Sequence, residues 1–201
     1  MLNRLELAPG RYKLRVAVRD SSGGALGSVL YDLQVPDFYK APLSISGLAL
    51  TSRAGATAIM TTKPDEQLKA VLPGPPVALR AFPLNDELSV FAEVYDNAAS
   101  TPHKVDITTT VTSDDAKVVF KTNEERSSAD LQGKGGGYGY TARIPMGDLG
   151  AGTFVLKVEA RSRLGQNPTA SREVQFTVGT PGPRPSPTVL PPSPAVPSRA
   201  G

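Results

Sequence analysis

With 201 residues, the chain is long enough for one or two domains that each bury a core. Lysine and arginine exceed aspartate and glutamate by only 22 − 19 = 3, and the basic residues mostly alternate along predicted strands, which argues against a nucleic-acid-binding surface. The absence of cysteine excludes disulfides, thiolate nucleophiles and cysteine metal sites.

Residues 11–19 alternate apolar and charged side chains, which is typical of a β-strand with one buried face. The apolar set is Tyr12, Leu14, Val16 and Val18. A segment rich in glycine and serine follows at residues 20–27, and a second strand pattern runs from Val29 to Val35. Together these features predict a β-hairpin.

The middle of the chain continues the period of two. Alternating apolar residues predict strands at residues 88–94, 105–111, 118–120 and 138–144. Residues 113–116, Ser-Asp-Asp-Ala, predict a hairpin loop. Only residues 63–71 favour a helix, a single short surface turn with Thr62 as a candidate cap and Pro64 in its first turn.

Two last strands are predicted at residues 153–161 and 174–178. In all, we expect a run of about nine strands from Leu43 to Val178. The sequence therefore predicts an all-β protein, an immunoglobulin-like or fibronectin-like β-sandwich.

An internal repeat relates the first and last predicted hairpins. Residues 7–19 align with residues 149–161 at a constant offset of 142. After one extra residue in the loop, the second strands align as well. The identical pairs are Leu7 with Leu149, Gly10 with Gly152, Leu14 with Leu156, Val16 with Val158 and Arg19 with Arg161.

The repeat predicts the domain organisation. The second copy closes a complete sandwich at residues 37–178. A lone hairpin is marginal in water, so residues 1–36 are expected to be the C-terminal hairpin of an incomplete upstream immunoglobulin-like domain, and Met1 need not be the biological start. Residues 179–201 hold eight of the nineteen prolines and predict a disordered proline-rich tail, with P-x-x-P spacings expected of any such tract.

No catalytic or metal-binding constellation emerges from the sequence, so we expect no enzyme activity and no cofactor. His103 is the only histidine and is expected in a surface loop. The adjacent acids at residues 86–87, 114–115 and 124–125 all lie beside turn signals and lack the spacing of a calcium loop. The glycine-rich residues 133–140 fit neither a phosphate-binding loop nor a dinucleotide fingerprint.

Aromatic residues on the predicted strands leave a binding alternative open. If their rings are exposed in a flat row, the chain is a carbohydrate-binding module. If they are scattered, a structural or protein-interaction module is favoured. The candidate ligand-contacting residues are Phe91, Tyr95, Tyr138 and Tyr140.

Four segments of the chain resemble the C-terminal region of bacterial von Willebrand factor A-related domain proteins, found notably in Acidobacteria. These segments are LELAPGRYKLRVAVRD, GSVLYDLQVPDF, VFAEVYDN and VDITTTV, and the resemblance covers roughly residues 2–178. In that family an exported von Willebrand A-type domain precedes sandwich modules. Its D-x-S-x-S metal motif does not occur in this chain, so no metal residue is carried over.

The resemblance implies an extracytoplasmic location, periplasmic, cell-surface or secreted, and a structural or adhesion-related role. The partner it implies is a protein, either the upstream von Willebrand A-type domain or another extracytoplasmic protein, with a glycan as the alternative. No window approaches the roughly 20 apolar residues of a membrane span. The first twenty residues contain no signal-peptide core, so an export signal is expected further upstream.

Overall fold

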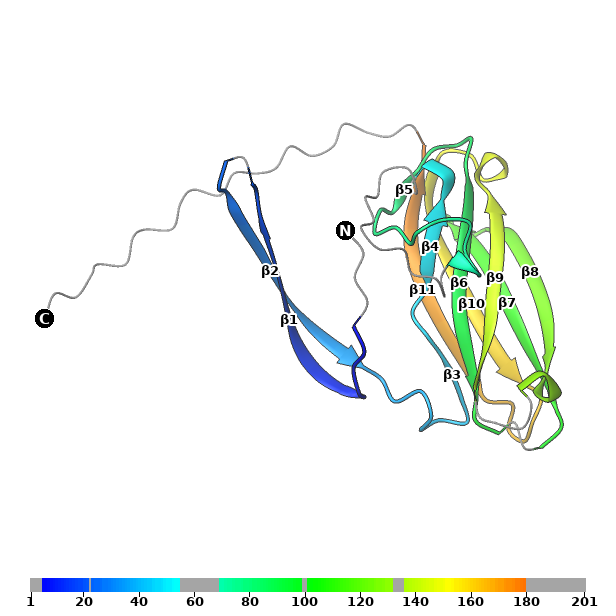
Figure 1. Cartoon of the computed structure of the whole chain (residues 1–201). Helices are drawn as coiled ribbons and strands as arrows, with labels where there is room; N and C mark the ends of the chain where they lie inside the picture. Colours follow the sequence, from blue (N-terminus) through cyan, green and yellow to red (C-terminus); the bar gives the residue numbers. More distant parts are fainter. Residues whose placement is uncertain (1–4, 22, 55–68, 99–100, 132–135, 180–201) are drawn as a thin grey trace, which may run out of the picture.

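The computed structural model describes residues 5–21, 23–54, 69–98, 101–131 and 136–179. Within them, residues 43–178 form two packed antiparallel-dominated sheets (Figure 1). The larger sheet has the order β5-β11-β10-β7-β8. Its strands are β5 (Ala81–Phe82), β7 (Lys104–Ser113), β8 (Val118–Ser127), β10 (Gly152–Ser162) and β11 (Thr169–Val178).

The smaller sheet is built around β6 (Glu87–Asp96), which pairs with β9 (Gly136–Pro145) along one edge. Along its other edge lie β3 (Leu43–Ile45) and β4 (Ala49–Ser52). Short 3-10 helices at Ser128–Leu131 and Met146–Asp148 flank β9. This arrangement confirms the predicted immunoglobulin-like or fibronectin-like sandwich, with the nine strands β3 to β11 among the described residues.

The sandwich core comes from the alternation seen in the sequence, because every second residue of a strand points to the same face. Each fully buried valine or leucine contributes about 1.5–3 kcal/mol relative to exposure, so this filled core is the main source of stability. The central side chains, all fully buried, are Leu88, Val90, Val94, Val105, Ile107, Val111, Ile144, Leu156 and Val158.

β3 and β4 are two halves of one interrupted edge strand. At the interruption, the Ser46 N–H donates to the carbonyl of Glu93 at 2.9 Å, and the Glu93 N–H donates to Oγ of Ser46 at 2.9 Å. The serine therefore satisfies the polar groups of β6 where the ladder is broken, as buried backbone requires. No local pattern in the sequence predicts this break.

Asp86 joins the end of β4 to the start of β6. Its carboxylate accepts hydrogen bonds from the backbone N–H groups of Arg53 (3.1 Å), Ala54 (3.0 Å) and Glu87 (2.8 Å). Partial burial disfavours the charged carboxylate, but hydrogen bonds from Ser52 and these amides outweigh it, and the pKa of Asp86 lies below its ordinary value.

We expect Asp86→Asn to flatten the acid limb of the stability curve. A lowered pKa in the folded state contributes stability above the unfolded pKa, near 3.8, and loses it as pH falls through the folded pKa. Chemical denaturation between pH 2 and pH 6 measures this. A variant whose free energy of unfolding falls as steeply below pH 4 as that of the wild type would contradict the assignment.

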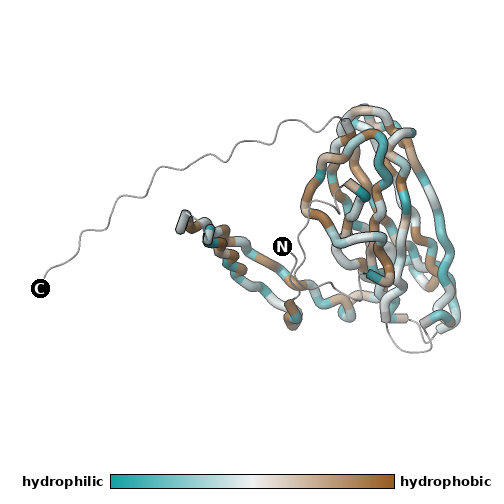
Figure 2. The backbone as a smooth tube through the Cα atoms, turned by 45° about the horizontal axis from the view of Figure 1, so that its top comes forward, coloured by the Kyte–Doolittle hydropathy of each residue, from teal (hydrophilic) through white to brown (hydrophobic). Residues whose placement is uncertain are grey.

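The first two strands form a separate two-stranded sheet. β1 (Gly10–Arg19) and β2 (Leu26–Val35) pair only with each other among the described residues, and the hairpin stands away from the sandwich in Figure 1. Figure 2 shows hydrophobic stretches along this hairpin that no other described element covers. The predicted hairpin is confirmed, with its apolar side chains largely exposed.

The two hairpins of the repeat have the same register. Gly10 lies opposite Val35 in the first, and Gly152 lies opposite Val178 in the second. A Cβ on either glycine would lie 3.5 Å from an aromatic ring two residues further on, Tyr12 in the first hairpin and Phe154 in the second. The duplication found in the sequence therefore extends to strand pairing and to a shared glycine–aromatic contact.

Three sequence predictions fall wholly or partly outside the described residues: the helix at 63–71, the glycine-rich loop at 133–140 and the tail at 179–201. The hairpin loop at 113–116 is confirmed. There the Ala116 N–H donates to the carbonyl of Ser113 at 3.0 Å, and Ala116 takes a left-handed φ of 64°.

Candidate functional site

An aromatic cluster marks the place where the hairpin joins the sandwich. We call it the junction cluster and define it as Phe38, Tyr39 and Tyr95. The Phe38 and Tyr95 rings are stacked with centroids 4.8 Å apart, and Tyr39 meets Tyr95 edge-on at 5.7 Å. Phe38 and Tyr39 directly follow the predicted boundary at Pro36-Asp37. Their position next to this boundary is the only feature of the sequence that points to Phe38 and Tyr39.

Glycines on β9 make room for the aromatic side chains of β6. A Cβ on Gly137 would lie 3.6 Å from the Tyr95 ring, and one on Gly139 would lie 3.5 Å from the Phe91 ring. Both rings therefore lie against the neighbouring strand on the outer face of the small sheet, half-buried. Small residues opposite large ones are a common way to pack such a face.

The Tyr95 hydroxyl is engaged inside the protein. It donates to Oε2 of Glu93 at 2.6 Å. Burial, reinforced by this hydrogen bond and by the negative charge of Glu93, raises the pKa of Tyr95 above its ordinary value. With one ring face stacked on Phe38 and its hydroxyl bonded, Tyr95 has little surface left for a ligand.

Asn97 ties the connecting segment to the sandwich. Its side-chain Nδ2 donates to the carbonyls of Phe38 (2.8 Å) and Ala41 (2.6 Å), and its backbone N–H donates to Pro42 at 2.9 Å. On the other side, the Tyr39 N–H donates to Oδ1 of Asp37 at 3.0 Å. The junction is thus a hydrogen-bonded turn fixed to the end of β6.

Two of the four aromatic candidates lie in the core instead of on the surface. Tyr138 is 5% exposed and Tyr140 is 1% exposed. The Tyr138 hydroxyl donates to Oδ2 of Asp96 at 3.1 Å, and the Tyr140 hydroxyl shares a 2.8 Å hydrogen bond with Thr109 Oγ1. Burial is the largest of the effects that raise the pKa of both hydroxyls. A ring enclosed in this way cannot stack on a sugar, so these two expectations are corrected.

His103 also differs from expectation, because its side chain is only 3% exposed. Nδ1 lies 2.5 Å from the carbonyl of Thr101, and Nε2 lies 2.8 Å from Oδ2 of Asp96. The Nε2 contact is an ion-pair distance without good hydrogen-bond alignment. The expected surface-loop histidine is therefore a structural one, held between two oxygen acceptors at the end of the sandwich.

The cluster of Asp96, His103 and Tyr138 does not have the geometry of a hydrolytic site. The nearby Ser128 hydroxyl accepts a hydrogen bond from the His103 backbone N–H at 3.0 Å and does not bond the imidazole. Asp96 and Ser128 are themselves 1% and 3% exposed. A nucleophile needs a hydrogen bond to its base and an open approach for substrate, and this cluster has neither.

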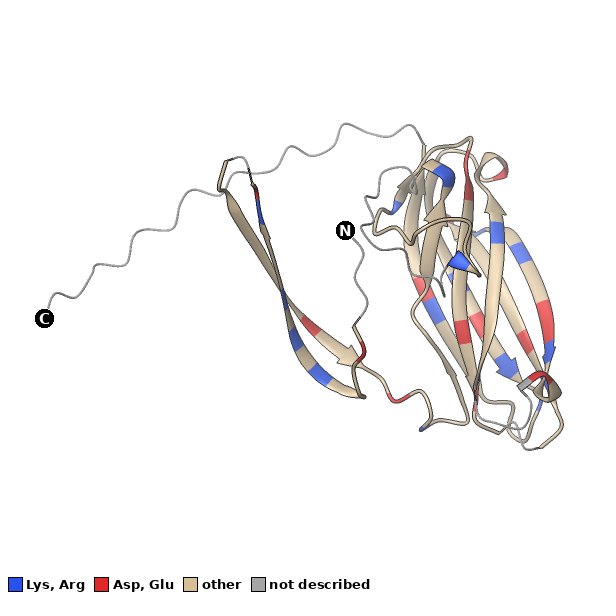
Figure 3. Ribbon diagram, in the orientation of Figure 1, with Lys and Arg blue, Asp and Glu red and all other residues tan. Residues whose placement is uncertain are grey.

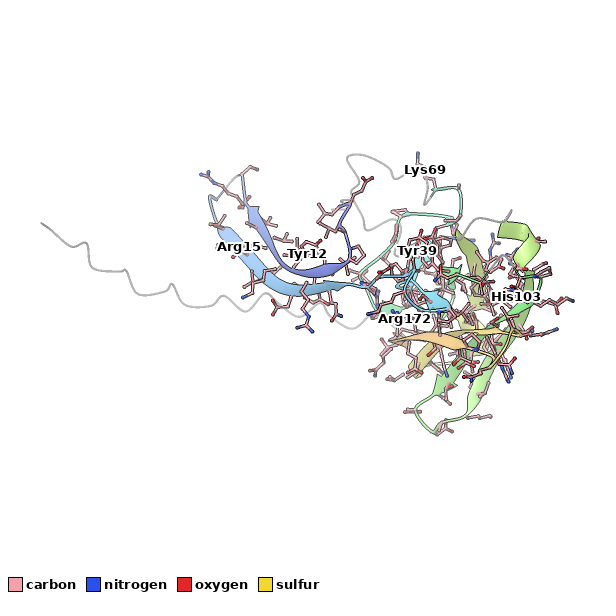
Figure 4. The ribbon with its side chains drawn as sticks, turned by 90° about the horizontal axis from the view of Figure 1, so that it is seen from below. Tyr12, Arg15, Tyr39, Lys69, His103 and Arg172 are labelled. Atoms are coloured by element: carbon pink, nitrogen blue, oxygen red, sulfur yellow. The ribbon has the colours of Figure 1, made fainter. Side chains whose placement is uncertain are left out.

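Exposed aromatic rings do not form a row on the described surface. Only Tyr31, on the hairpin, and Tyr39, at the junction, are more than half exposed among the described aromatic side chains, at 61% and 64%. Figure 4 places Tyr39 on the side of the sandwich near the hairpin and His103 well away from it. Phe91 and Tyr95 contribute only half-buried rings.

Within the described ranges, no group of three or more histidine, aspartate or glutamate side chains is arranged to hold a metal ion. None of the described segments is a helix long and apolar enough to cross a membrane. In the ribbon, lysine, arginine, aspartate and glutamate positions are distributed along the strands of the sandwich and of the hairpin (Figure 3).

No protein-family model matches the chain, and neither does any curated protein. Among solved structures, the chain is similar to a glycosyl hydrolase family 2 member from Bacteroides cellulosilyticus, with 13% identity and a TM-score of 0.36 over 75% of this chain. It is also similar to dimeric latent PorU from Porphyromonas gingivalis, with 11% identity and a TM-score of 0.33 over 86% of this chain. The chain spans 15% and 12% of the length of these two proteins.

Proposed function

We propose that the chain is a non-catalytic structural or protein-interaction module of a larger exported bacterial protein related to the von Willebrand A-type domain proteins. In this role the sandwich at residues 37–178 holds the segment before it at a fixed junction. The resemblance of four sequence segments supports the family and the extracytoplasmic location.

The observation that carries the proposal is the construction of the junction. Asn97 bonds two carbonyls of the connecting segment, and Phe38 stacks on Tyr95. Side chains at a flexible linker would be solvated instead, since ordering a backbone residue costs about 1–2 kcal/mol. In this module the half-buried aromatic rings pack against the connecting segment, which suits a spacer or a support. Its partner is then a protein domain joined to it.

The same observation weakens the carbohydrate-binding alternative. Sugar-binding surfaces need open aromatic faces, and the Tyr95 ring is already covered by Phe38. The remaining open ring of the junction cluster is Tyr39. A single exposed tyrosine provides no row of stacking positions for a glycan chain.

Limited proteolysis tests the junction at a site that the chain itself provides. Lys40 lies in the turn between Phe38 and Ala41, so trypsin can cut after it only if the turn opens. Removing both side-chain hydrogen bonds in Asn97→Ala should speed cleavage after Lys40 about tenfold, because each such bond contributes about 0.5–1.5 kcal/mol. Mass spectrometry of the fragment that begins at Ala41 measures the rate.

Asn123→Ala is the matched control. Asn123 accepts a hydrogen bond from Thr108 Oγ1 on the exposed face of the larger sheet, and its loss should leave the rate at Lys40 unchanged. If the wild type is cut after Lys40 as fast as Asn97→Ala, the junction is a flexible linker and the proposed supporting role fails.

A further inference from the structure

The β1–β2 hairpin has one apolar face and one charged face. Residues directly opposite each other in an antiparallel pair project to the same side. The register therefore places most apolar side chains of both strands on one face, while lysine and arginine, together with Leu26 and Leu30, project from the other. The apolar face comprises Tyr12, Leu14, Val16, Val18, Val29, Tyr31, Leu33 and Val35.

This apolar face lacks a covering layer among the described residues. Val16 is 46% exposed, Val29 61% and Tyr31 61%. On β10, the positions equivalent to Tyr12, Leu14 and Val16 hold Phe154, which is 3% exposed, and Leu156 and Val158, which are fully buried. On β11, Arg172 stands in the place of Val29, and the half-buried Val174 stands in the place of Tyr31. The apolar residues of β10 are therefore covered, whereas the matching residues of β1 are half-buried or exposed.

The second copy shows what covers such a hairpin. The inward face of β10 and β11 belongs to one core cluster with residues of β3, β6 and β9, and β3 lies nearest to it across the sandwich. The outer edge of β10 pairs with β7 from Phe154, opposite Ser113, to Ser162, opposite Val105. In chain order, β6, β7 and β9 all come before this hairpin.

A hydrogen bond at the start of β1 indicates the same place in a sandwich. The Tyr12 hydroxyl donates to the carbonyl of Ala8 at 2.8 Å. A tyrosine that bonds the backbone a few residues upstream is the tyrosine corner, found near the start of the sixth strand of immunoglobulin-like domains. The corresponding strand of the second sandwich is β10, the last strand but one, which lies between β11 and β7 and has Phe154 in place of Tyr12.

A second copy of this chain is a poor cover for the face. Ten residues per strand at about 3.4 Å each, over two strands about 4.8 Å apart, give a face of roughly 330 Å². A stable dimer buries about 800 Å² per partner. An open sandwich would cover both the face and the free edge of β1, and a second hairpin offers much less.

We propose that the apolar face and outer edge of the hairpin dock the remaining strands of an immunoglobulin-like sandwich, supplied by polypeptide that precedes Leu5. In that domain β1 and β2 take the places of β10 and β11, and the strand paired with β1 corresponds to β7. The proposal rests on the modular function above, and it names the partner of the first module.

The chain contains the means to test this. Residues 37–148 contain the strands that cover β10 and β11. In a tandem chain, a second copy of residues 37–148 is joined directly to Leu7, in the same way that Asp148 precedes Leu149. If the hairpin is the end of a sandwich, it should pack on the added strands and form a complete sandwich with them. Its amide hydrogens should then exchange about 100-fold more slowly than in the chain of 201 residues, where they should exchange rapidly in a monomer.

Two variants of the tandem chain serve as controls. An exact duplication, with residues 149–178 in place of residues 7–35, shows that the added strands fold when their own hairpin follows. Val16→Lys places a charge on the docking face and should abolish the protection of β1 and β2 while leaving residues 37–178 protected.

Two results would overturn the docking proposal. The first is an unprotected native hairpin when the exact duplication is protected. The second is a stable dimer of the 201-residue chain with protected β1 and β2, which would assign the face to a second copy. Neither result depends on cleavage at Lys40, so the proposal about the junction and the proposal about the docking surface are tested independently.

Discussion

Leu156→Ala is expected to lower the free energy of unfolding of the sandwich by about 2–5 kcal/mol. Leu156 is fully buried between the two sheets, and its removal leaves a cavity that a β-sandwich core cannot close without moving its strands. Urea or thermal denaturation followed by circular dichroism measures the change.

Leu14→Ala is the matched control for this substitution. Leu14 is the identical residue at the equivalent position of the first hairpin, but it is half-buried within the hairpin alone. We expect no change in the unfolding transition of the sandwich. A comparable loss in both variants would mean that the hairpin packs on residues 37–178 and that the chain folds as one larger β domain.

Asp96→Ala is expected to destabilise the protein by about 1–3 kcal/mol for each buried polar group that loses its acceptor. Asp96 is 1% exposed and accepts hydrogen bonds from the Tyr138 hydroxyl and the Ala98 N–H, besides facing His103. Its removal leaves a buried imidazole and a buried hydroxyl without their acceptor. Denaturation at neutral pH measures the loss.

A surface ion pair provides the comparison for Asp96. Asp106 accepts two hydrogen bonds from Arg163, at 2.8 and 2.6 Å, where solvent screens the charges. Asp106→Ala should therefore change stability far less. Adding His103→Leu to Asp96→Ala should recover part of the loss, because the uncompensated imidazole is then gone. Equal losses in the two aspartate variants would contradict a buried network at Asp96.

The predicted alternation was a reliable guide wherever a strand has one buried face. Leu88, Val90 and Val94 were placed on one side of a strand and are all fully buried. The hairpin repeat was also visible, because equivalent positions in two sandwich ends need equivalent side chains. These features depend on residues close in sequence, which is why they can be predicted without a structure.

The polar and aromatic residues were harder to place. Tyr138 and Tyr140 follow a glycine-rich segment, and nothing local distinguishes an inward tyrosine from an exposed one when its hydroxyl finds a distant partner. Those partners, Asp96 and Thr109, lie 42 and 31 residues away. His103 has the composition of a surface loop around it, and only the fold brings Asp96 to its ring.

The sequence by itself determined the all-β class, the positions of the long strands and the internal duplication, because each is encoded in a period of two and in local turn chemistry. Only the tertiary structure decided which side chains from different strands and loops contact one another. It broke the first edge strand at Ser46, buried His103 against Asp96, and stacked Phe38 on Tyr95 to fix the junction. It also left the apolar face of the first hairpin uncovered by any other part of the chain that the structure describes. Each of these depends on contacts between residues far apart in the chain, whose free energies come from the packing and solvent exclusion of the whole sandwich.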